Sequence, residues 1–413
     1  MTKIAFATWI ADIYGVGPQR RSELIHLSSM NLTQQLFSKL PHSTQLTIAN
    51  RLLDYNILHR LPLFRMFFHT LESFGADRDE MMLALENARN FNGSFHRSWH
   101  DLGRNLFREA QEHEEEGDPY TAKDKYLRSA IYHLVADWPL ERGPLKRRNY
   151  ELALEAFESF KRFHIPQIQK VDLPFPRGKL KANLRLPEGI DKPCPAVVIF
   201  QGNDSVKEFM VFVEDYALER GIATLSVDQP GFGESGMTGN LLDSERAARL
   251  CIGSAFRFMT QHPSIDHEAV GAFGFSFGGF TSLYSAGLSD KVHAVATIGA
   301  PMHLRNVYKN LSVMMKQRTF QWSGCSTDQE VYAMLQNMDV ANVVSRIKCP
   351  AYIIHGEEDE VVDRKEARSI CRAIQGKTTL EFVPGADHTC SVHLDELLPR
   401  VFDWMGEQLR SKA

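Results

Sequence analysis

Hydrophobic positions over the first 165 residues recur mainly at steps of three and four, which is the period of an amphipathic helix. Glycines are few here, and runs of β-branched residues are absent. Ala122 and Tyr126 mark the buried face of one expected helix, and Phe157 marks that of the next. A glutamate-rich stretch, 109–118, contains a glycine and ends the helix before them. The pattern predicts an all-helical region of helical hairpins.

After residue 165 the pattern changes to that of strands. The stretches 171–175 and 180–186 flank Arg177-Gly178 and predict an antiparallel hairpin. Continuous apolar runs, which are typical of strands buried on both faces, then follow at 196–202, 222–227, 270–275, 294–298, 351–354 and 379–383. Helical patterns separate most of them, so we expect an α/β fold with a mostly parallel, doubly wound sheet.

We therefore expect two domains, a helical cap over 1–165 and an α/β core over 166–413. Within the core, residues 301–347 exceed what one crossover helix needs and are rich in Met, Phe and Trp. This segment predicts a second cap-like insertion, and ordinary packing is the alternative. The apolar stretch 61–68 favours a buried helix face over a substrate-lining surface.

One short motif suggests chemistry. Gly274-Phe275-Ser276-Phe277-Gly278 fits G-x-S-x-G, with an apolar run before it and a helical pattern after it. This is the nucleophile elbow of α/β-hydrolases, in which a sharp strand-to-helix turn exposes a serine. Ser276 is therefore the candidate nucleophile. A glycine-rich turn with an incidental serine is the alternative.

A serine nucleophile needs a base, and the base needs an orienting acid. His355-Gly356-Glu357-Glu358-Asp359 follows a predicted strand and selects Asp359 as the acid. The other carboxylates of this loop are the alternatives, and we expect them to be solvated: Glu357, Glu358, Glu360 and Asp363. His388 follows the last predicted strand and is the candidate base. The order Ser, Asp, His is that of α/β-hydrolases.

An oxyanion formed by serine attack needs two N–H donors. We expect the backbone N–H groups of Phe277 and Asn203 to supply them, because Asn203 follows the first buried strand. The turn 228–235 reads D-x-P-G-x-G-x-S, which supports the fold. Its glycines do not follow G-x-G-x-x-G, so we expect no cofactor.

These residues resemble the 2,6-dihydroxypseudooxynicotine hydrolase group, which includes the FrsA-like esterases and fungal polyketide-shortening hydrolases. The resemblance covers about residues 90 to 405 and is most specific at 205–208, 228–231 and the elbow. It implies an α/β-hydrolase fold with a helical cap. It also implies that Glu208 supplements the triad in proton handling, close to His388 and Ser276; a surface helix-capping role is the alternative.

The expected function is therefore that of a serine hydrolase. The bond could be an ester, a thioester or the activated C–C bond of a 1,3-diketone, and the resemblance favours an aromatic or polyketide-like substrate. Two alternatives stay open: an acyltransferase or cyclase on the same triad, and a non-catalytic FrsA-like regulatory binding protein.

Composition and charge bear on the binding partners, metal sites, disulfides and location that we expect. The net charge of −4 gives no electrostatic case for nucleic acid, and no apolar run is long enough to span a membrane. Six scattered cysteines without a C-x-x-C pair argue against a zinc site or a disulfide framework. We read the N-terminal apolar stretch 1–12 as a packed helix and expect a cytoplasmic protein that binds a small-molecule substrate. The apolar content of 50–70 suggests a homodimer, which sedimentation at micromolar concentration would test.

Overall fold

The computed structural model describes residues 40–41, 44–45, 62–90, 94–176, 178–189, 192–311 and 313–410. One compact unit extends from Leu53 to Ala413 and contains all the helices and strands discussed below. The predicted N-terminal helix over 1–12 and Arg177 lie outside the described residues. No helix in the described part of the chain is long and apolar enough to cross a membrane.

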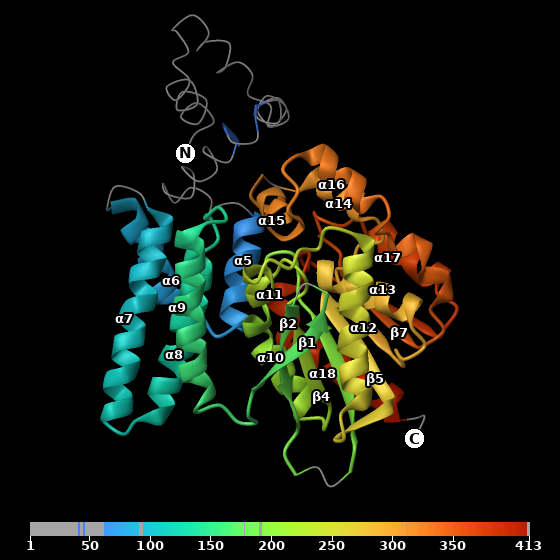
Figure 1. Ribbon diagram of the computed structural model, residues 1–413, viewed down its shortest axis with the longest axis horizontal. Coiled ribbons are helices and arrows are strands. Elements are labelled where there is room, and N and C mark those ends of the chain that lie inside the picture. The colour runs from blue at the N-terminus through green and yellow to red at the C-terminus, as the bar shows by residue number, and fades with distance from the viewer. Residues whose placement is uncertain are drawn as a thin grey trace, which may run out of the picture. The chain divides into compact units, whose positions relative to one another are not determined.

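In the described part of the chain, five helices precede the first strand, and we call them the helical region: α5 Pro62–Ser73, α6 Arg78–Asn90, α7 Phe95–Glu115, α8 Pro119–Ala136 and α9 Pro144–Lys161. Figure 1 shows α7, α8 and α9 side by side. The predicted turn between α7 and α8 is confirmed, because Gly117 has φ +81° and Asp118 accepts the Thr121 N–H as the N-cap of α8. Phe67 and Phe68 of α5 pack against buried apolar side chains, as predicted for a helix face.

Eight strands form one sheet: β1 Gln169–Phe175, β2 Gly178–Arg185, β3 Cys194–Phe200, β4 Ala223–Val227, β5 Ile265–Phe275, β6 Val295–Ile298, β7 Ala351–Gly356 and β8 Thr378–Val383. Their order across the sheet is β1-β2-β4-β3-β5-β6-β7-β8. The β1–β2 hairpin is antiparallel, β2 is antiparallel to β4, and every other pair is parallel. The predicted mostly parallel sheet is confirmed.

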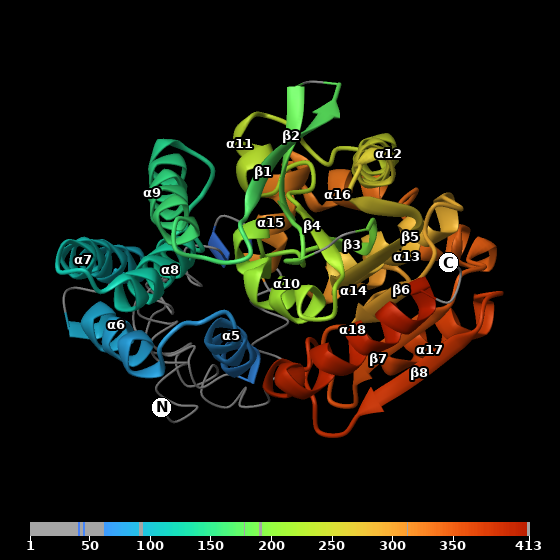
Figure 2. The same ribbon diagram turned by 90° about the horizontal axis from the view of Figure 1, so that it is seen from below.

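Helices cover both faces of the sheet because neighbouring residues of each central strand point to opposite sides. On β3, Val198 and Phe200 pack with α12 Glu245–Gln261 and α13 Phe277–Leu288. Val197 and Ile199 pack instead with α10 Val211–Leu218 and α18 Leu394–Arg410. Figure 2 shows α18 and α10 on one side of the sheet and α12 on the other. This is the α/β-hydrolase architecture that the sequence predicts.

The chain between β6 and β7 is largely helical: α14 Leu304–Asn310, α15 Val313–Ser323 and α16 Asp328–Leu335, with 3-10 turns at Val340–Asn342 and Val344–Arg346. This is the segment predicted as an insertion. The other short elements are a 3-10 turn at Lys207–Met210, α11 Gly233–Met237, α17 Arg364–Ala373 and a 3-10 turn at Ser391–His393. The predicted boundary near residue 165 falls between α9 and β1, and the division into domains stays a prediction, as does the homodimer.

The main difference from the sequence analysis lies in β5. This strand begins at Ile265, whereas the predicted apolar run begins at 270. The apolar pattern does not predict the first residues of the strand because Asp266, His267 and Glu268 are polar. These polar side chains lie at the partly exposed start of the strand.

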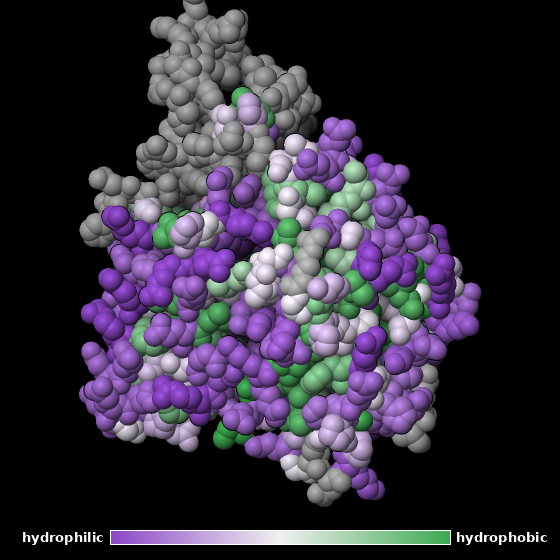
Figure 3. Space-filling model, in the orientation of Figure 1, coloured by the Kyte–Doolittle hydropathy of each residue, from purple (hydrophilic) through white to green (hydrophobic). Residues whose placement is uncertain are grey.

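Figure 3 shows hydrophilic residues over much of one face of the molecule, with hydrophobic residues between them.

Candidate active site

The candidate site lies where the sheet reverses its winding. The connection from β3 leads to β4 on one side, whereas the connection from β5 leads to β6 on the other. A crevice opens at such a point, beyond the carboxyl ends of the two diverging strands. The loop that follows Phe200 and the serine that follows Phe275 both lie there. The fold therefore places Asn203 and Ser276 beside the same crevice.

Ser276 sits in a strained turn between β5 and α13. Its φ of 51° and ψ of −118° are unusual for a residue with a side chain, and they mark the sharp elbow predicted from G-x-S-x-G. The flanking glycines are required sterically. A Cβ on Gly278 would overlap the carbonyl oxygen of Phe200, and one on Gly274 would overlap the backbone of Gly278. The motif is thus needed for close strand-to-helix packing.

The structure brings Ser276, His388 and Asp359 into one hydrogen-bonded chain. His388 Nε2 lies 2.7 Å from Ser276 Oγ, and His388 Nδ1 lies 2.7 Å from Asp359 Oδ2. Asp359 follows β7 and His388 follows β8, so adjacent strands supply them. Gly299, which follows β6 with φ +65°, leaves room for the backbone of His388. The three residues have the geometry of a serine nucleophile, its base and an orienting acid.

The electrostatics of this chain favour an ion pair between His388 and Asp359, whose side chains are 6% and 1% exposed. Burial disfavours the charged imidazole, but the Asp359 carboxylate outweighs it and raises the pKa of His388. Burial likewise opposes ionisation of Asp359. Even so, His388 and backbone hydrogen bonding hold the pKa of Asp359 below its usual value. Asp359 Oδ1 accepts the N–H groups of Val361 and Val362, both at 2.8 Å, which fixes the carboxylate.

The alternative carboxylates of the Asp359 loop make no such contact with His388. Glu357, Glu358 and Glu360 are exposed, as expected for solvated side chains. Asp363 caps α17 by accepting the Lys365 N–H at 2.8 Å. The structure therefore directs only Asp359, among these five, to the imidazole.

The two predicted oxyanion donors lie in the segments that follow β5 and β3. Phe277 is the first residue of α13, and the first N–H groups of a helix have no partner within it. Asn203 belongs to the loop after β3, and a Cβ on its neighbour Gly202 would lie 3.8 Å from Ser276 Cβ. The Asn203 side chain is fixed by α15, because its Oδ1 accepts the Trp322 Nε1–H at 2.5 Å and its Nδ2 donates to Met315 O at 3.4 Å.

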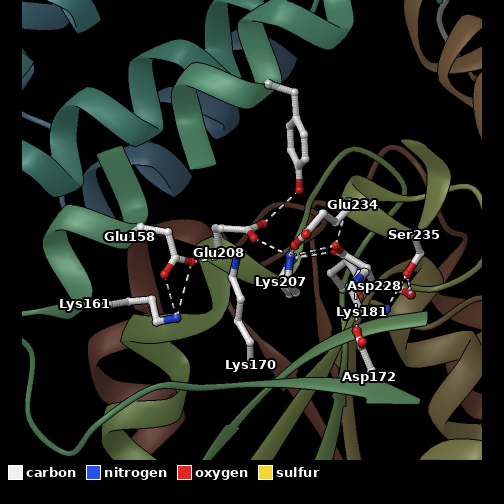
Figure 4. Close-up of polar contacts among 12 residues, drawn as sticks. Glu158, Lys161, Lys170, Asp172, Lys181, Lys207, Glu208, Asp228, Glu234 and Ser235 are labelled. Carbon is white, nitrogen blue, oxygen red and sulfur yellow. Dashed lines mark hydrogen bonds and ion pairs between the residues drawn. The ribbon is translucent and has the colours of Figure 1, made fainter. Parts of the chain in front are cut away.

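Glu208 lies in a buried cluster of charges shown in Figure 4. Its carboxylate pairs with Lys207 Nζ and accepts the Tyr150 hydroxyl of α9 at 3.2 Å. At 4% exposed it is not the surface residue of the alternative interpretation. Neither Ser276 nor His388 is among its hydrogen-bond partners, so its role in proton handling stays a prediction. Instead, Glu208 links the helical region to the loop that carries Asn203.

Lys207 is the centre of this cluster. Its ammonium lies 3.0 Å from both Asp228 and Glu234, besides its contact with Glu208. Burial raises the pKa of Asp228 to about 7, even though Lys207 attracts the charged form. Asp228 Oδ1 also accepts the Lys207 backbone N–H at 3.0 Å. The cluster thus ties the loop after β3 to the turn 228–235, which the sequence analysis identified only as a fold signal.

A cavity of about 510 Å³ opens between the helical region, these loops and α15. Asn203, Asp204 and Trp322 are among its lining residues, and the first two directly follow Gly202, which lies close to Ser276. Asp204 is a residue that sequence reasoning missed: its charge acts on His388 and raises the pKa of that imidazole, after the larger effects of burial and Asp359. Its position just beyond β3 was the available signal. Other cavity residues, including Tyr150 of α9 and Arg318 of α15, had no local signal.

Within the described residues, no group of three or more His, Cys, Asp or Glu side chains has the arrangement of a metal site.

The fold defines the protein as an α/β-hydrolase. Residues 79–410 match the model of the "Esterase FrsA-like" family, so the chain belongs to the FrsA-like esterase family. The resemblance stated from the sequence is confirmed in these terms.

Individual relatives agree with this assignment. The chain is 27% identical to 2,6-dihydropseudooxynicotine hydrolase of Paenarthrobacter nicotinovorans over 75% of this chain and 83% of the relative. It is 29% identical to esterase FrsA of Vibrio cholerae over 54% of this chain and 52% of that protein, so it spans about half the length of the FrsA relative. These relatives are hydrolases, and the chain is an enzyme of the α/β-hydrolase class.

Solved structures show the same fold. The crystal structure of 2,6-dihydroxy-pseudo-oxynicotine hydrolase aligns with a TM-score of 0.74 and 22% identity, covering 84% of this chain and 96% of that one. AbyA5 aligns with a TM-score of 0.63 and 18% identity, covering 85% and 100%. Both alignments extend well beyond the sheet, so they include helical segments outside it.

Proposed function

We propose that the protein is a serine hydrolase in which Ser276, His388 and Asp359 form the catalytic triad. The observation that supports this most directly is the continuous hydrogen-bonded chain from Ser276 Oγ through both nitrogens of His388 to Asp359, with 2.7 Å at each step. The strained backbone of Ser276 adds to it, because such strain persists where surrounding structure enforces it and is common at active sites.

In the proposed reaction, Ser276 Oγ attacks a carbonyl carbon while His388 Nε2 accepts the hydroxyl proton. Asp359 stabilises the imidazolium, and the N–H groups of Phe277 and Asn203 stabilise the oxyanion. The intermediate collapses as the leaving group takes the proton from His388, which gives an acyl-enzyme. Water then attacks the acyl carbon with His388 again accepting a proton, and Ser276 is released.

We propose an ester, or the activated C–C bond of a 1,3-diketone, in an aromatic or polyketide-like substrate. The cavity supports this class, because Phe209, Phe232 and Trp322 line it and its volume suits a small organic molecule. The names of the relatives support hydrolysis, and one of them is an esterase. For C–C cleavage, we further propose that Glu208 assists proton transfer from its place beside Tyr150.

The test is steady-state hydrolysis of aryl esters of increasing acyl length. We expect turnover by the wild type and a loss of about 10⁴-fold or more in kcat for Ser276→Ala, because the variant lacks the nucleophile. Ser289→Ala is the matched control, since Ser289 lies at the end of the same helix. Wild-type protein that hydrolyses no ester and no 1,3-diketone would refute the proposal and favour a binding role.

A further inference from the structure

The cavity beside the candidate triad carries an excess of positive charge. Arg142, Lys146 and Arg318 line it, and we call these three residues the basic wall. Arg142 comes from the α8–α9 connection, Lys146 from the start of α9, and Arg318 from α15. The wall is joined across the two segments, because Arg142 donates to the Gln321 carbonyl of α15.

Asp137 is the carboxylate that forms ion pairs with the basic wall. Lys146 Nζ lies 2.6 Å from Asp137 Oδ2, and Arg318 lies 3.7 Å from the same oxygen. Arg142 donates instead to a neutral carbonyl, so Asp137 pairs with only two of these three cations. The Arg318 Nε–H is buried and has no hydrogen-bond partner in the described structure. A buried donor without a partner is costly, so the wall is incomplete as an ion-pair network.

The other groups that face the wall do not restore the balance. Asp204 also lines the cavity and is attracted by Arg318, but no ion pair joins it to the three cations in the described structure, and burial raises the pKa of its carboxyl. Burial, together with repulsion from Arg318 and Arg142, lowers the pKa of Lys146 to about 7, although Asp137 acts in the opposite direction. Burial is the largest of these effects, and the two arginines add to it.

We propose that the basic wall binds a carboxylate of the substrate, remote from the carbonyl that Ser276 attacks. This inference rests on the proposed function and adds the substrate class: acyl compounds with an apolar or aromatic body and a free carboxylate. The body lies against Phe209, Phe232 and Trp322, and the carboxylate accepts from the Arg318 guanidinium and the Lys146 ammonium. A bound carboxylate supplies the second anion that the wall lacks.

The experiment measures binding without turnover. Isothermal titration of Ser276→Ala uses a matched pair of ligands, the mono-para-nitrophenyl ester of glutaric acid and its methyl-capped neutral diester. We expect the carboxylate to bind on the order of ten- to a hundred-fold more tightly than the capped ligand, since hydrogen bonds to charged groups are worth this much. Adding Arg318→Gln or Lys146→Met should bring the ratio toward one.

Arg148→Gln is the control, because Arg148 is exposed and its nearest ion partner is Glu151 at 3.7 Å. It should keep the preference. Equal affinity of Ser276→Ala for the two ligands would overturn the inference. So would an equal loss of affinity for the carboxylate and for the capped ligand when Arg318→Gln or Lys146→Met is added. The two proposals fail separately: a carboxylate preference in a protein that hydrolyses no ester refutes only the hydrolase, and ester hydrolysis without the preference refutes only the basic wall.

Discussion

Replacing Lys207 by Met should strongly destabilise the protein. Lys207 is 1% exposed and contacts Glu208, Asp228 and Glu234. Methionine has a similar length but no charge, so the substitution leaves three carboxylates together without their cation. Removing one partner of a buried ion pair costs about 3–5 kcal/mol. Because this cation contacts three carboxylates, we expect Lys207→Met to lower the free energy of unfolding by about 3–5 kcal/mol or more.

The assay is urea unfolding followed by tryptophan fluorescence, with Lys179→Met as the matched control. Lys179 is 62% exposed and pairs with Asp172 at 2.9 Å. An exposed pair contributes only about 0–1 kcal/mol, so the control should unfold almost like the wild type. Equal effects of the two substitutions would refute the argument that burial makes the Lys207 cluster costly to disrupt.

The stability deficit of Lys207→Met should also depend on pH. Burial raises the pKa of Asp228 to about 7, so this group favours the folded state at low pH and loses that contribution as pH rises through about 7. Loss of the Lys207 charge raises the pKa of Asp228 further, so this carboxyl becomes neutral in mild acid and the repulsion in the cluster falls. The deficit of Lys207→Met should therefore be smaller at pH 5.5 than at pH 8. A deficit that grows toward acid would contradict this sign.

Three further predictions concern the site. Because the pKa of His388 is raised, we expect kcat/KM to fall in acid at a pH above the usual histidine pKa, since the base must be neutral. Asp359→Asn should lower both that apparent pKa and the rate, and an unchanged pH profile in this variant would argue against the Asp359–His388 pair. Gly278→Ala should abolish activity or folding, because its Cβ would overlap the Phe200 carbonyl oxygen. Gly253→Ala, at an open helical position, should leave thermal stability unchanged or raise it by about 0.5–1 kcal/mol. Similar behaviour of the two variants would contradict the steric explanation. Glu208→Gln should slow cleavage of a 1,3-diketone more than that of an aryl ester, and equal slowing of both reactions would indicate a positioning role alone.

The fold and the main site residues could be predicted because their signals are local. The elbow needs glycines next to the serine, and the acid and the base each lie in the loop that follows a predicted strand. Parallel strands end at the same edge of a sheet, so Ser276, Asp359 and His388 converge once the strands are placed in order. The same logic applies to Asp204, which also follows a strand but matched no motif.

The rest of the site depends on contacts between distant segments. Lys207-Glu208 is an adjacent pair of opposite charges, which the sequence alone does not distinguish from a surface pair, and only the folded turn 228–235 supplies the other carboxylates. The basic wall likewise needs α9 and α15, which are more than 150 residues apart in the chain. Hydrophobic periodicity carries no information on such pairings of polar side chains.

The most direct test of the central claim is active-site labelling with a fluorophosphonate, followed by mass spectrometry of the modified peptide. An activated serine reacts because its neighbouring base removes the hydroxyl proton. We expect one phosphonylated site at Ser276, with labelling lost in Ser276→Ala, strongly slowed in His388→Ala and retained in Ser289→Ala. Wild-type protein that stays unlabelled, or that is labelled at another serine, would contradict the assignment of Ser276 as the nucleophile.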